Sequence, residues 1–515
     1  MSNTSSSGVE TSSTISTADR RALFWACFMA IAATAAIFAV RGQVIGDWAH
    51  EFGLTETQKG EILGVGLWPF AASIVLVSLV ADRIGYGKCL FFAFSCHVAS
   101  TVTLLFAKGY WGLYAGTLLA SLGNGSAQAI ADPLVASLYR HNKTTWLNIL
   151  HASWPAGMVA GGIAGIALGV GGGLDWRWRI GMLLVPIVLY GILMLGHRFP
   201  VHERIEAGVS DREMFRETGG IGLFLVLVFM FGEFGRLLAL PWYAGAGAAL
   251  VCAGLFGVFT RSFGRPMFLF LLLLMIPLAT TELGTDSWIT SLMEGPMTAM
   301  ALNAGWVLVY TSLIMMILRF CAAPVVKLLT PLGVLIVSCA LAAAGLVALS
   351  HATGLAILLA ATLYGCGKSY LWPTMLGIVA ERFPKGGALA MNATSAVGMM
   401  SVGIVGTVFL GLIQDRAVET RLQAEQPALH QQVIISKHSV LGDYQAVDLD
   451  KVKHLSAEQQ TAIHELTGVA SKHALTTTAI FPSAMFVAYL GLFLIFRSRG
   501  GYRAVALAPP PSNQP

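Results

Sequence analysis

Amide and ionisable side chains recur every fourth residue inside one apolar stretch of the chain. Residues 110–138 carry Asn124, Gln128 and Asp132, which share one face if the stretch is helical. A charge within an apolar span is costly unless it faces a cavity or finds a partner. We therefore expect Asn124 and Gln128 to bind a polar solute and Asp132 to carry a proton. The alternative is that Asp132 accepts backbone N–H groups near the inner boundary.

A second apolar stretch, residues 354–380, offers an ammonium group where the first offers a carboxylate. Lys368 and Trp372 are again four residues apart and so share a helix face. Lys368 could meet an anionic group of a solute, or it could pair structurally with a carboxylate. Trp372 could stack on a solute or simply pack against its neighbours.

Two more stretches add polar and aromatic candidates. His151 and Trp154 lie within residues 145–170, and Asn392 lies within 387–413. Histidine side chains exchange protons readily in proteins, so His151 is expected to serve in proton coupling as well as solute binding. Packing roles for His151 and Trp154 are the open alternative, while Asn392 is expected to bind solute.

Charged residues also gather near the outer ends of two stretches. Arg41 is placed where it could meet a carboxylate of a solute, and Glu282 and Asp286 lie four residues apart on one helix face. We expect the two carboxylates to take part in proton coupling. An equally open reading is that all three are solvated or close an outer gate.

The composition decides the class of protein. Hydrophobic residues make up 56% and charged residues 11% of the 515 residues, and the mean hydropathy is +0.70. The apolar stretches approach the ~20 residues that cross a bilayer as a helix, and they lack the alternation of barrel strands. The sequence therefore predicts an all-α polytopic membrane protein whose surroundings are the lipid bilayer.

Charge and cysteine usage exclude several other classes. The net charge of +5 is small, and the basic residues lie in short loops, so no nucleic-acid partner is expected. The seven cysteines lie in or beside apolar helices without metal-ligand spacing. We expect no metal, no cofactor and no disulfide framework.

The apolar pattern predicts an ordered series of spans and loops. The predicted spans are 22–44, 57–80, 89–107, 110–138, 145–170, 179–196, 219–235, 238–260, 266–288, 303–322, 332–350, 354–380, 387–413 and 476–496. The pair within 219–260 could instead be a re-entrant or interfacial hairpin. Basic residues concentrate in alternate loops, which predicts both termini in the cytoplasm and an even number of spans.

The chain contains an internal repeat. His151–Gly165 aligns with Asn392–Gly406 at six identical positions, and Gly125/Gly365, Pro133/Pro373 and Trp48/Trp288 match at nearly the same offset. Repeats that keep one orientation across the membrane predict two six-helix halves. The predicted domains are a tail 1–20, a half 21–197, a linker 198–265 with two extra spans, a half 266–497 and a tail 498–515.

The loop after the second span carries a family signature. Ser78-Leu-Val-Ala-Asp82-Arg83-Ile-Gly85-Tyr-Gly87-Lys88 resembles the signature of the major facilitator superfamily, with Ser78 in place of Gly and Tyr86 in place of a basic residue. In that family the signature latches the two halves on the cytoplasmic side. The resemblance therefore assigns Asp82, Arg83, Gly85 and Lys88 to a conformational latch, with Arg140 as the expected partner of Asp82.

A fainter likeness is to the fucose-permease-like sugar porters. It rests on Asn148-Ile-Leu-His151-Ala and on Asp132-Pro133. The arginine motif that proton-coupled relatives carry in their fourth helix is missing here, so the coupling mechanism is not implied by the resemblance.

Together these features predict a monomeric secondary transporter in a bacterial inner membrane rather than an enzyme. The expected substrate is a small polar organic solute, such as a sugar, sugar acid or other organic anion, moved with protons by alternating access. Three alternatives remain: proton-driven efflux of amphiphiles, which the extra spans favour, an integral-membrane enzyme using His151 and Asp132, and a membrane sensor.

One long polar segment, residues 414–475, interrupts the second half on the predicted outer face. Ser456, followed three residues later by Gln459, predicts a helix start, with a helix to about Ser471. The segment is expected to be a structured cap or insertion, with a ligand-capturing lid as the alternative. The sensor hypothesis would use it as the receptor.

Overall fold

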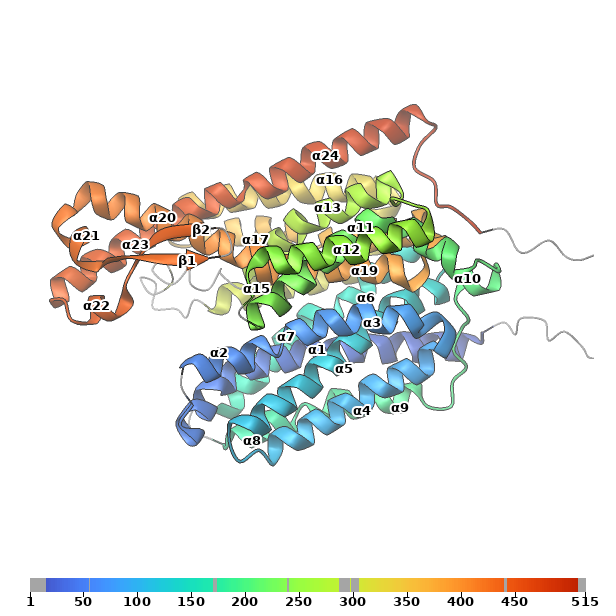
Figure 1. Ribbon diagram of the computed structural model, residues 1–515, viewed down its shortest axis with the longest axis horizontal. Coiled ribbons are helices and arrows are strands. Elements are labelled where there is room, and N and C mark those ends of the chain that lie inside the picture. Colours follow the sequence, from blue (N-terminus) through green and yellow to red (C-terminus); the bar gives the residue numbers. More distant parts are fainter. Residues whose placement is uncertain are drawn as a thin grey trace, which may run out of the picture.

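The computed structural model describes residues 15–54, 56–169, 174–238, 240–286, 297, 305–439 and 442–507. Two helical bundles lie side by side, one built from the first half of the chain and one from the second (Figure 1). The helix α1 begins and α24 ends at the same end of the molecule, whereas residues 414–475 project from the opposite end.

The helices of the first bundle follow the predicted spans, with three spans divided by breaks. They are α1 (Thr17–Phe52), α2 (Glu56–Gly64), α3 (Trp68–Ile84), α4 (Tyr86–Leu105), α5 (Tyr110–Leu138), α6 (Lys143–His151), α7 (Ser153–Gly169), α8 (Trp176–Gly181) and α9 (Leu184–Met194). The linker contains α10 (Glu203–Glu206), α11 (Asp211–Leu237) and α12 (Trp242–Thr260).

The second bundle has the same kind of elements and adds a projecting segment. Its membrane part is α13 (Pro266–Ala279), η1 (Thr280–Gly284), α15 (Gly305–Phe320), α16 (Ala322–His351), α17 (Ala356–Lys368), α18 (Leu371–Arg382), η2 (Pro384–Gly386), α19 (Gly387–Ser401), η3 (Val402–Gly406), α20 (Thr407–Glu425) and α24 (Ile480–Ser498). The projecting segment adds α21 (Pro427–Val433), β1 (Ile434–Ser439), β2 (Gly442–Val447), α22 (Leu449–Lys453) and α23 (Ala457–Thr478).

The outer surface of the bundles suits a lipid environment. Within the described ranges, nine helical stretches are long and apolar enough to cross a membrane by length and composition. Large apolar side chains are exposed on their outer faces, among them Leu76, Phe91 and Ile192. Such a surface would be unfavourable in water and is the expected one in a bilayer.

Prolines explain why several spans are broken. Proline lacks an N–H, so it leaves the carbonyl four residues earlier without its helical partner. Pro69 follows the break between α2 and α3, Pro155 the break between α6 and α7, and Pro373 the break between α17 and α18. The carbonyl groups of His151 and Ser369 are therefore free to accept hydrogen bonds from elsewhere.

The inserted pair consists of two long helices rather than a short hairpin. The helix α11 has 27 residues and begins with a capping box between Ser210 and Glu213. The chain bends at Gly219, whose φ is 60°, and the helical part after this bend, residues 220–237, approaches the ~30 Å of a bilayer core at ~1.5 Å per residue. The helix packs on α13 and α19 of the second half and touches α3 of the first. Phe234 meets Trp68 edge-on, with ring centroids 5.3 Å apart, so the insertion bridges the two halves.

The two halves are in direct contact at the end where both termini lie, which we call the closed end. The Thr144 hydroxyl donates to Glu381 Oε1 at 2.6 Å, and Asn148 Nδ2 donates to Thr374 Oγ1 at 3.1 Å. Lys143 Nζ also reaches the Ala380 carbonyl at 3.3 Å. These bonds join α6 to α18 and shut the molecule at this end.

Asp82 of the signature lies at the closed end with a partner that the sequence did not indicate. Its Oδ2 accepts a hydrogen bond from Arg204 Nε at 3.1 Å, and both side chains are almost fully buried. Gly387, which begins α19, has a φ of 56° and lies so close that an added Cβ would be 2.8 Å from this oxygen. The carboxylate therefore sits at the N-terminus of a helix in the other half, where a negative charge is favoured.

The expected pair between Asp82 and Arg140 is not formed. Arg140 Nη1 instead donates to Glu206 at 2.6 Å, and this contact raises the pKa of the guanidinium. The linker supplies a different partner to each residue: Arg204 pairs with Asp82, and the acidic residues of α10 pair with Arg140.

The other signature residues occupy the turn between α3 and α4. Gly85 ends α3 with a φ of 94°, a conformation that favours glycine. Arg83 forms an ion pair with Asp211 at the start of α11, and Lys88 is exposed on the first turn of α4.

The segment between α20 and α24 forms a small unit with its own core. The strands β1 and β2 pair antiparallel, and the helix α23 starts with a capping box between Ser456 and Gln459. The predicted helix start is thus confirmed, although the helix continues to Thr478. The core side chains are Leu422, Leu429, Val433, Val452, Ile463 and Leu466.

We predict that Arg204→Ala lowers the free energy of unfolding by about 3–5 kcal/mol, because it leaves the buried Asp82 carboxylate without its cation. Thermal unfolding of the purified protein in detergent measures this. The matched control is Arg83→Ala, which removes an arginine that also contacts Asp211 but whose side chain is 70% exposed; only a small change is expected there. Equal destabilisation by both variants would contradict the latch.

Candidate functional site

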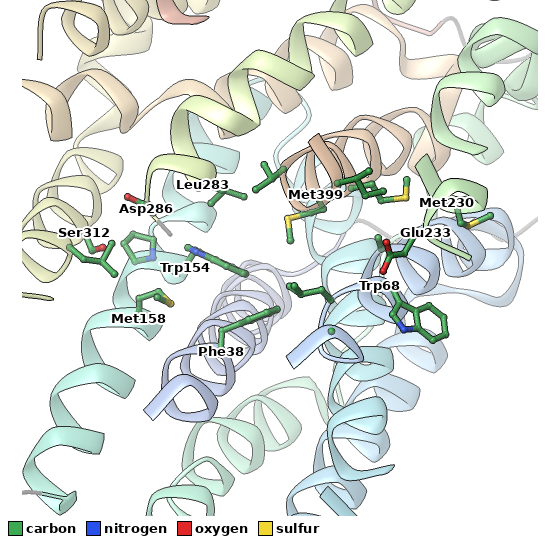
Figure 2. A pocket seen from close by; sticks show the side chains of 18 of the residues that line it. Phe38, Trp68, Trp154, Met158, Met230, Glu233, Leu283, Asp286, Ser312 and Met399 are labelled. Atoms are coloured by element: carbon green, nitrogen blue, oxygen red, sulfur yellow. The ribbon is translucent and has the colours of Figure 1, made fainter. Parts of the chain in front are cut away.

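A cavity of about 760 Å³ lies between the two halves, within the size range of small-molecule sites. Figure 2 shows Asp286 and Ser312 close to Trp154 on one side of it, and Glu233 close to Trp68 on another. The lining comes from both halves and from the inserted helix α11. Its members are Phe38, Gly64, Leu67, Trp68, Ala71, Trp154, Pro155, Met158, Met230, Glu233, Phe234, Arg236, Leu283, Asp286, Leu308, Ser312, Met315, Met399, Met400, Val402 and Ile404.

The wall of the cavity is mainly aromatic and aliphatic. Phe38 and Trp154 form one packed pair, with ring centroids 5.7 Å apart. Several methionines complete the wall, and their flexible, polarisable side chains adapt to irregular ligands. Such a surface binds the apolar part of a molecule by removing it from water.

The charged groups on the wall are paired. Arg236 donates to Glu233 at 2.5 Å within α11, and Asp286 forms an ion pair with Lys368. Lys368 is fully buried, whereas the Asp286 side chain retains 21% of its exposure. The carboxylate of this second pair therefore faces the cavity and its cation lies behind it.

Arg319 is held beside the cavity by two backbone carbonyls that lack a helical partner because a proline follows four residues later. Met315, one helical turn before it, lines the cavity. Arg319 Nε donates to the carbonyl of Ser369 at 2.6 Å, and Nη1 donates to the carbonyl of His151 at 2.8 Å. These are the carbonyls four residues before Pro373 and Pro155. A single guanidinium thus donates hydrogen bonds to the free carbonyls at two helix breaks, one in each half.

Glu282 completes this arrangement. Arg319 Nη2 donates to its Oε1 at 2.5 Å, and the backbone N–H of Trp372 donates to its Oε2 at 2.9 Å. That N–H belongs to the first turn of α18, where helical N–H groups lack partners. Glu282 itself lies in the π-helical turn η1, a distortion that often occurs at functional sites.

The first half contributes a second buried network. Gln128 Nε2 donates to Asp132 Oδ2 at 2.6 Å, and His151 Nε2 lies 2.8 Å from Asp132 Oδ1. The His151 ring therefore contacts Asp132, while its carbonyl accepts from Arg319. One residue at a helix break links the carboxylate of one half to the cation of the other.

The structure distributes the predicted site residues between the cavity wall and the layers behind it. Trp154 and Asp286 line the cavity, and Gln128, Asp132 and His151 are hydrogen-bonded to one another behind it. Lys368 pairs with Asp286 in its own half rather than facing Asp132.

The remaining predicted residues are buried outside the cavity wall. The Asn124 side chain bonds to His97 at 2.9 Å, and Asn392 Nδ2 donates to the carbonyl of Ala129 at 2.8 Å. Trp372 packs in the core of the second half, and Arg41 lies behind Phe38. Trp288, which the repeat matched to Trp48, lies outside the described residues.

Sequence reasoning missed two charged residues of the site. Arg319 falls near the end of the predicted span 303–322, and Glu233 belongs to the predicted span pair within 219–260 whose nature was open. The sequence signal for Arg319 is indirect. Pro155 and Pro373 each leave a carbonyl without its helical partner, and each such carbonyl needs a hydrogen-bond donor nearby. Within the described ranges, no group of three or more His, Cys, Asp or Glu side chains could hold a metal ion.

Comparison with known sequences decides the family. The family model of the Major Facilitator Superfamily matches residues 22–408. The chain belongs to this superfamily. Members of this superfamily are integral membrane transporters rather than enzymes.

The TsgA proteins of Salmonella resemble this member of the superfamily in sequence. Protein TsgA of Salmonella paratyphi B is 27% identical over 246 residues, which cover 46% of this chain. The match spans 61% of the length of that relative. TsgA of Salmonella typhimurium is equally similar, at 27% identity over 246 residues, with the same coverage of both chains.

Solved structures of low sequence identity share the fold. The E. coli fucose:proton symporter FucP aligns over 90% of this chain and 98% of its own, with a TM-score of 0.56 and 12% identity. The proton:xylose symporter XylE aligns over 92% and 95%, with a TM-score of 0.62 and 13% identity. The human organic anion transporter MFSD10 aligns over 92% and 99%, with a TM-score of 0.55 and 10% identity.

We predict that Arg319→Met lowers the free energy of unfolding by about 3–5 kcal/mol. The substitution leaves the buried carboxylate of Glu282 and the buried carbonyls of Ser369 and His151 without their hydrogen-bond donor. The double variant Arg319→Met/Glu282→Gln should recover part of this loss, since no lone charge remains and the glutamine oxygen can still accept from Trp372. Thermal unfolding in detergent measures both. A double variant whose loss equals the sum of the two single losses would show that the two residues are not coupled.

Proposed function

We propose that this transporter moves a small organic solute through the cavity by alternating access, with proton movement as its driving force. The proposal depends on one observation: the cavity of about 760 Å³ between the halves is bounded by charged networks that link both halves. Substrate sites near the midplane at the interface of repeats are typical of such folds.

The closed end supports the alternating-access part of the proposal. Hydrogen bonds of α6 with α18 and the Asp82–Arg204 pair shut the end where both termini lie. If that end is cytoplasmic, as the loop charges predict, the structure represents an outward-facing state. Transport then requires these contacts to break while the opposite end closes.

The buried carboxylates give the proton a route. Protonation of Asp132 would change its bonds to Gln128 and His151, and His151 is tied to Arg319 through its carbonyl. Protonation of Glu282 would remove the charge that holds Arg319. Either event alters contacts between the halves, which is how a proton can bias the exchange of states.

The wall of the cavity favours a solute with an apolar body and a polar end. Aromatic and methionine side chains would take the apolar body, and Asp286 with Ser312 would meet the polar end. A sugar is the second candidate, because Trp154 offers a ring on which a sugar can stack. The fold likeness to FucP and XylE is in keeping with it, but the amides expected to bind hydroxyl groups, Asn124, Gln128 and Asn392, do not line the cavity.

We predict that Asp132→Asn abolishes uphill transport but leaves downhill exchange of the same solute, because the carboxamide cannot release a proton. Proteoliposomes loaded with a pH-sensitive dye measure proton movement during a screen of sugars, sugar acids, amphiphilic anions and amines. The direction of proton flow relative to the solute distinguishes uptake from efflux.

The control for this variant is Asp175→Asn. Asp175 caps α8, and its carboxylate retains 49% of its exposure at the edge of the bundle, where it pairs with Arg177. Its replacement should leave uphill transport unchanged. Proton-driven accumulation by Asp132→Asn at the wild-type rate would remove Asp132 from the coupling route, and absence of proton-linked transport for every solute would overturn the proposal.

A further inference from the structure

Arg41 is buried beside the cavity without an anionic partner. Its side chain is 6% exposed, and its Nε and Nη1 atoms have no hydrogen-bond partner among the described residues. No ion pair that the described part of the chain forms includes it. A buried, unpaired cation is strongly unfavourable, and such groups are usually retained for binding or catalysis.

The guanidinium lies directly behind the cavity wall. Its Cζ atom is 4.8 Å from the centre of the Phe38 ring, and Phe38 both lines the cavity and packs against Trp154. On its other side lies Gly66, where any side chain would overlap the guanidinium. Gly66 belongs to the turn between α2 and α3 that Pro69 follows, so the helix break makes room for Arg41.

The other cations at the cavity are paired. Glu233 is paired with Arg236, Asp286 with Lys368, and Glu282 with Arg319, and Asp132 behind the wall is hydrogen-bonded to Gln128 and His151. Arg41 is therefore the cation without an anionic partner among the described charged groups at this cavity. An uncompensated cation beside an apolar, aromatic wall is complementary to a ligand that carries a negative charge on an apolar body.

We propose that the substrate is an amphiphilic organic anion, a carboxylate or sulfonate on an aromatic or aliphatic body, whose charge is received by Arg41. This assignment rests on the transport function proposed above and names its substrate class. The anionic group would form charge-assisted hydrogen bonds with the guanidinium. The apolar body would lie along Phe38 and Trp154, and the methionines would adapt to its shape.

Tryptophan fluorescence of the purified full-length protein tests the charge preference, because Trp68 and Trp154 line the cavity. The probes are 1-naphthoate, its neutral amide and 1-naphthylmethylammonium, which share one ring system. Naphthoate should bind most tightly. Arg41→Gln should weaken naphthoate binding at least tenfold and leave the amide unchanged, whereas Arg41→Lys should retain part of the affinity.

Thermal unfolding without ligand separates a binding role from a structural one. Arg41→Gln removes an unpaired buried charge, so its melting temperature should equal or exceed that of the wild type. The matched control is Arg179→Gln, which replaces a buried arginine that pairs with Asp47 at 2.5 Å. It should lower the melting temperature and leave naphthoate binding unchanged.

Three results would overturn the assignment: tighter binding of the ammonium probe than of naphthoate, unchanged naphthoate binding by Arg41→Gln, or a melting temperature of Arg41→Gln lowered as much as that of Arg179→Gln. Absence of binding by all three probes would count against it as well. None of these results bears on proton-linked transport, which the Asp132→Asn experiment tests separately.

Discussion

Arg319 makes the contacts on which the centre of this protein depends. Prolines break two helices next to the cavity, and each break leaves a buried carbonyl that must find a donor. The planar guanidinium supplies donors in several fixed directions and reaches Ser369, His151 and Glu282 at once. Because His151 belongs to the other half, the same interaction that satisfies the breaks also holds the two halves together.

The residues of this central network are bonded to one another and do not line the cavity wall. The carboxylates and cations around it are arranged in pairs, so the wall itself is mostly apolar, with Trp154 and Asp286 as its aromatic and charged contacts. Arg41 departs from this pairing. The two proposed roles are therefore assigned to different layers: the proposed proton-carrying groups lie behind the wall, and the proposed substrate would meet the wall and Arg41.

The linker between the halves takes part in both closure and cavity formation. Arg204 holds the signature carboxylate of Asp82 at the closed end, and α11 brings Glu233 to the cavity and Phe234 to Trp68. Under the proposed alternating access, a change of state would move the linker together with the halves. The inserted helix α11 contributes to the cavity wall rather than lying at the edge of the molecule.

The sequence alone determined the membrane class, the positions of the helices, the repeat and the family, because these follow from apolar runs and local motifs. It also identified Asp132, His151 and Glu282 as functional candidates, since buried charges are costly wherever they occur. Only the tertiary structure decided the partners: Lys368 with Asp286, Asp82 with Arg204, and Arg319 with two released carbonyls. The partner of a buried charge depends on which helices lie next to each other in the folded protein. The spacing of residues along the chain does not show which helices these are.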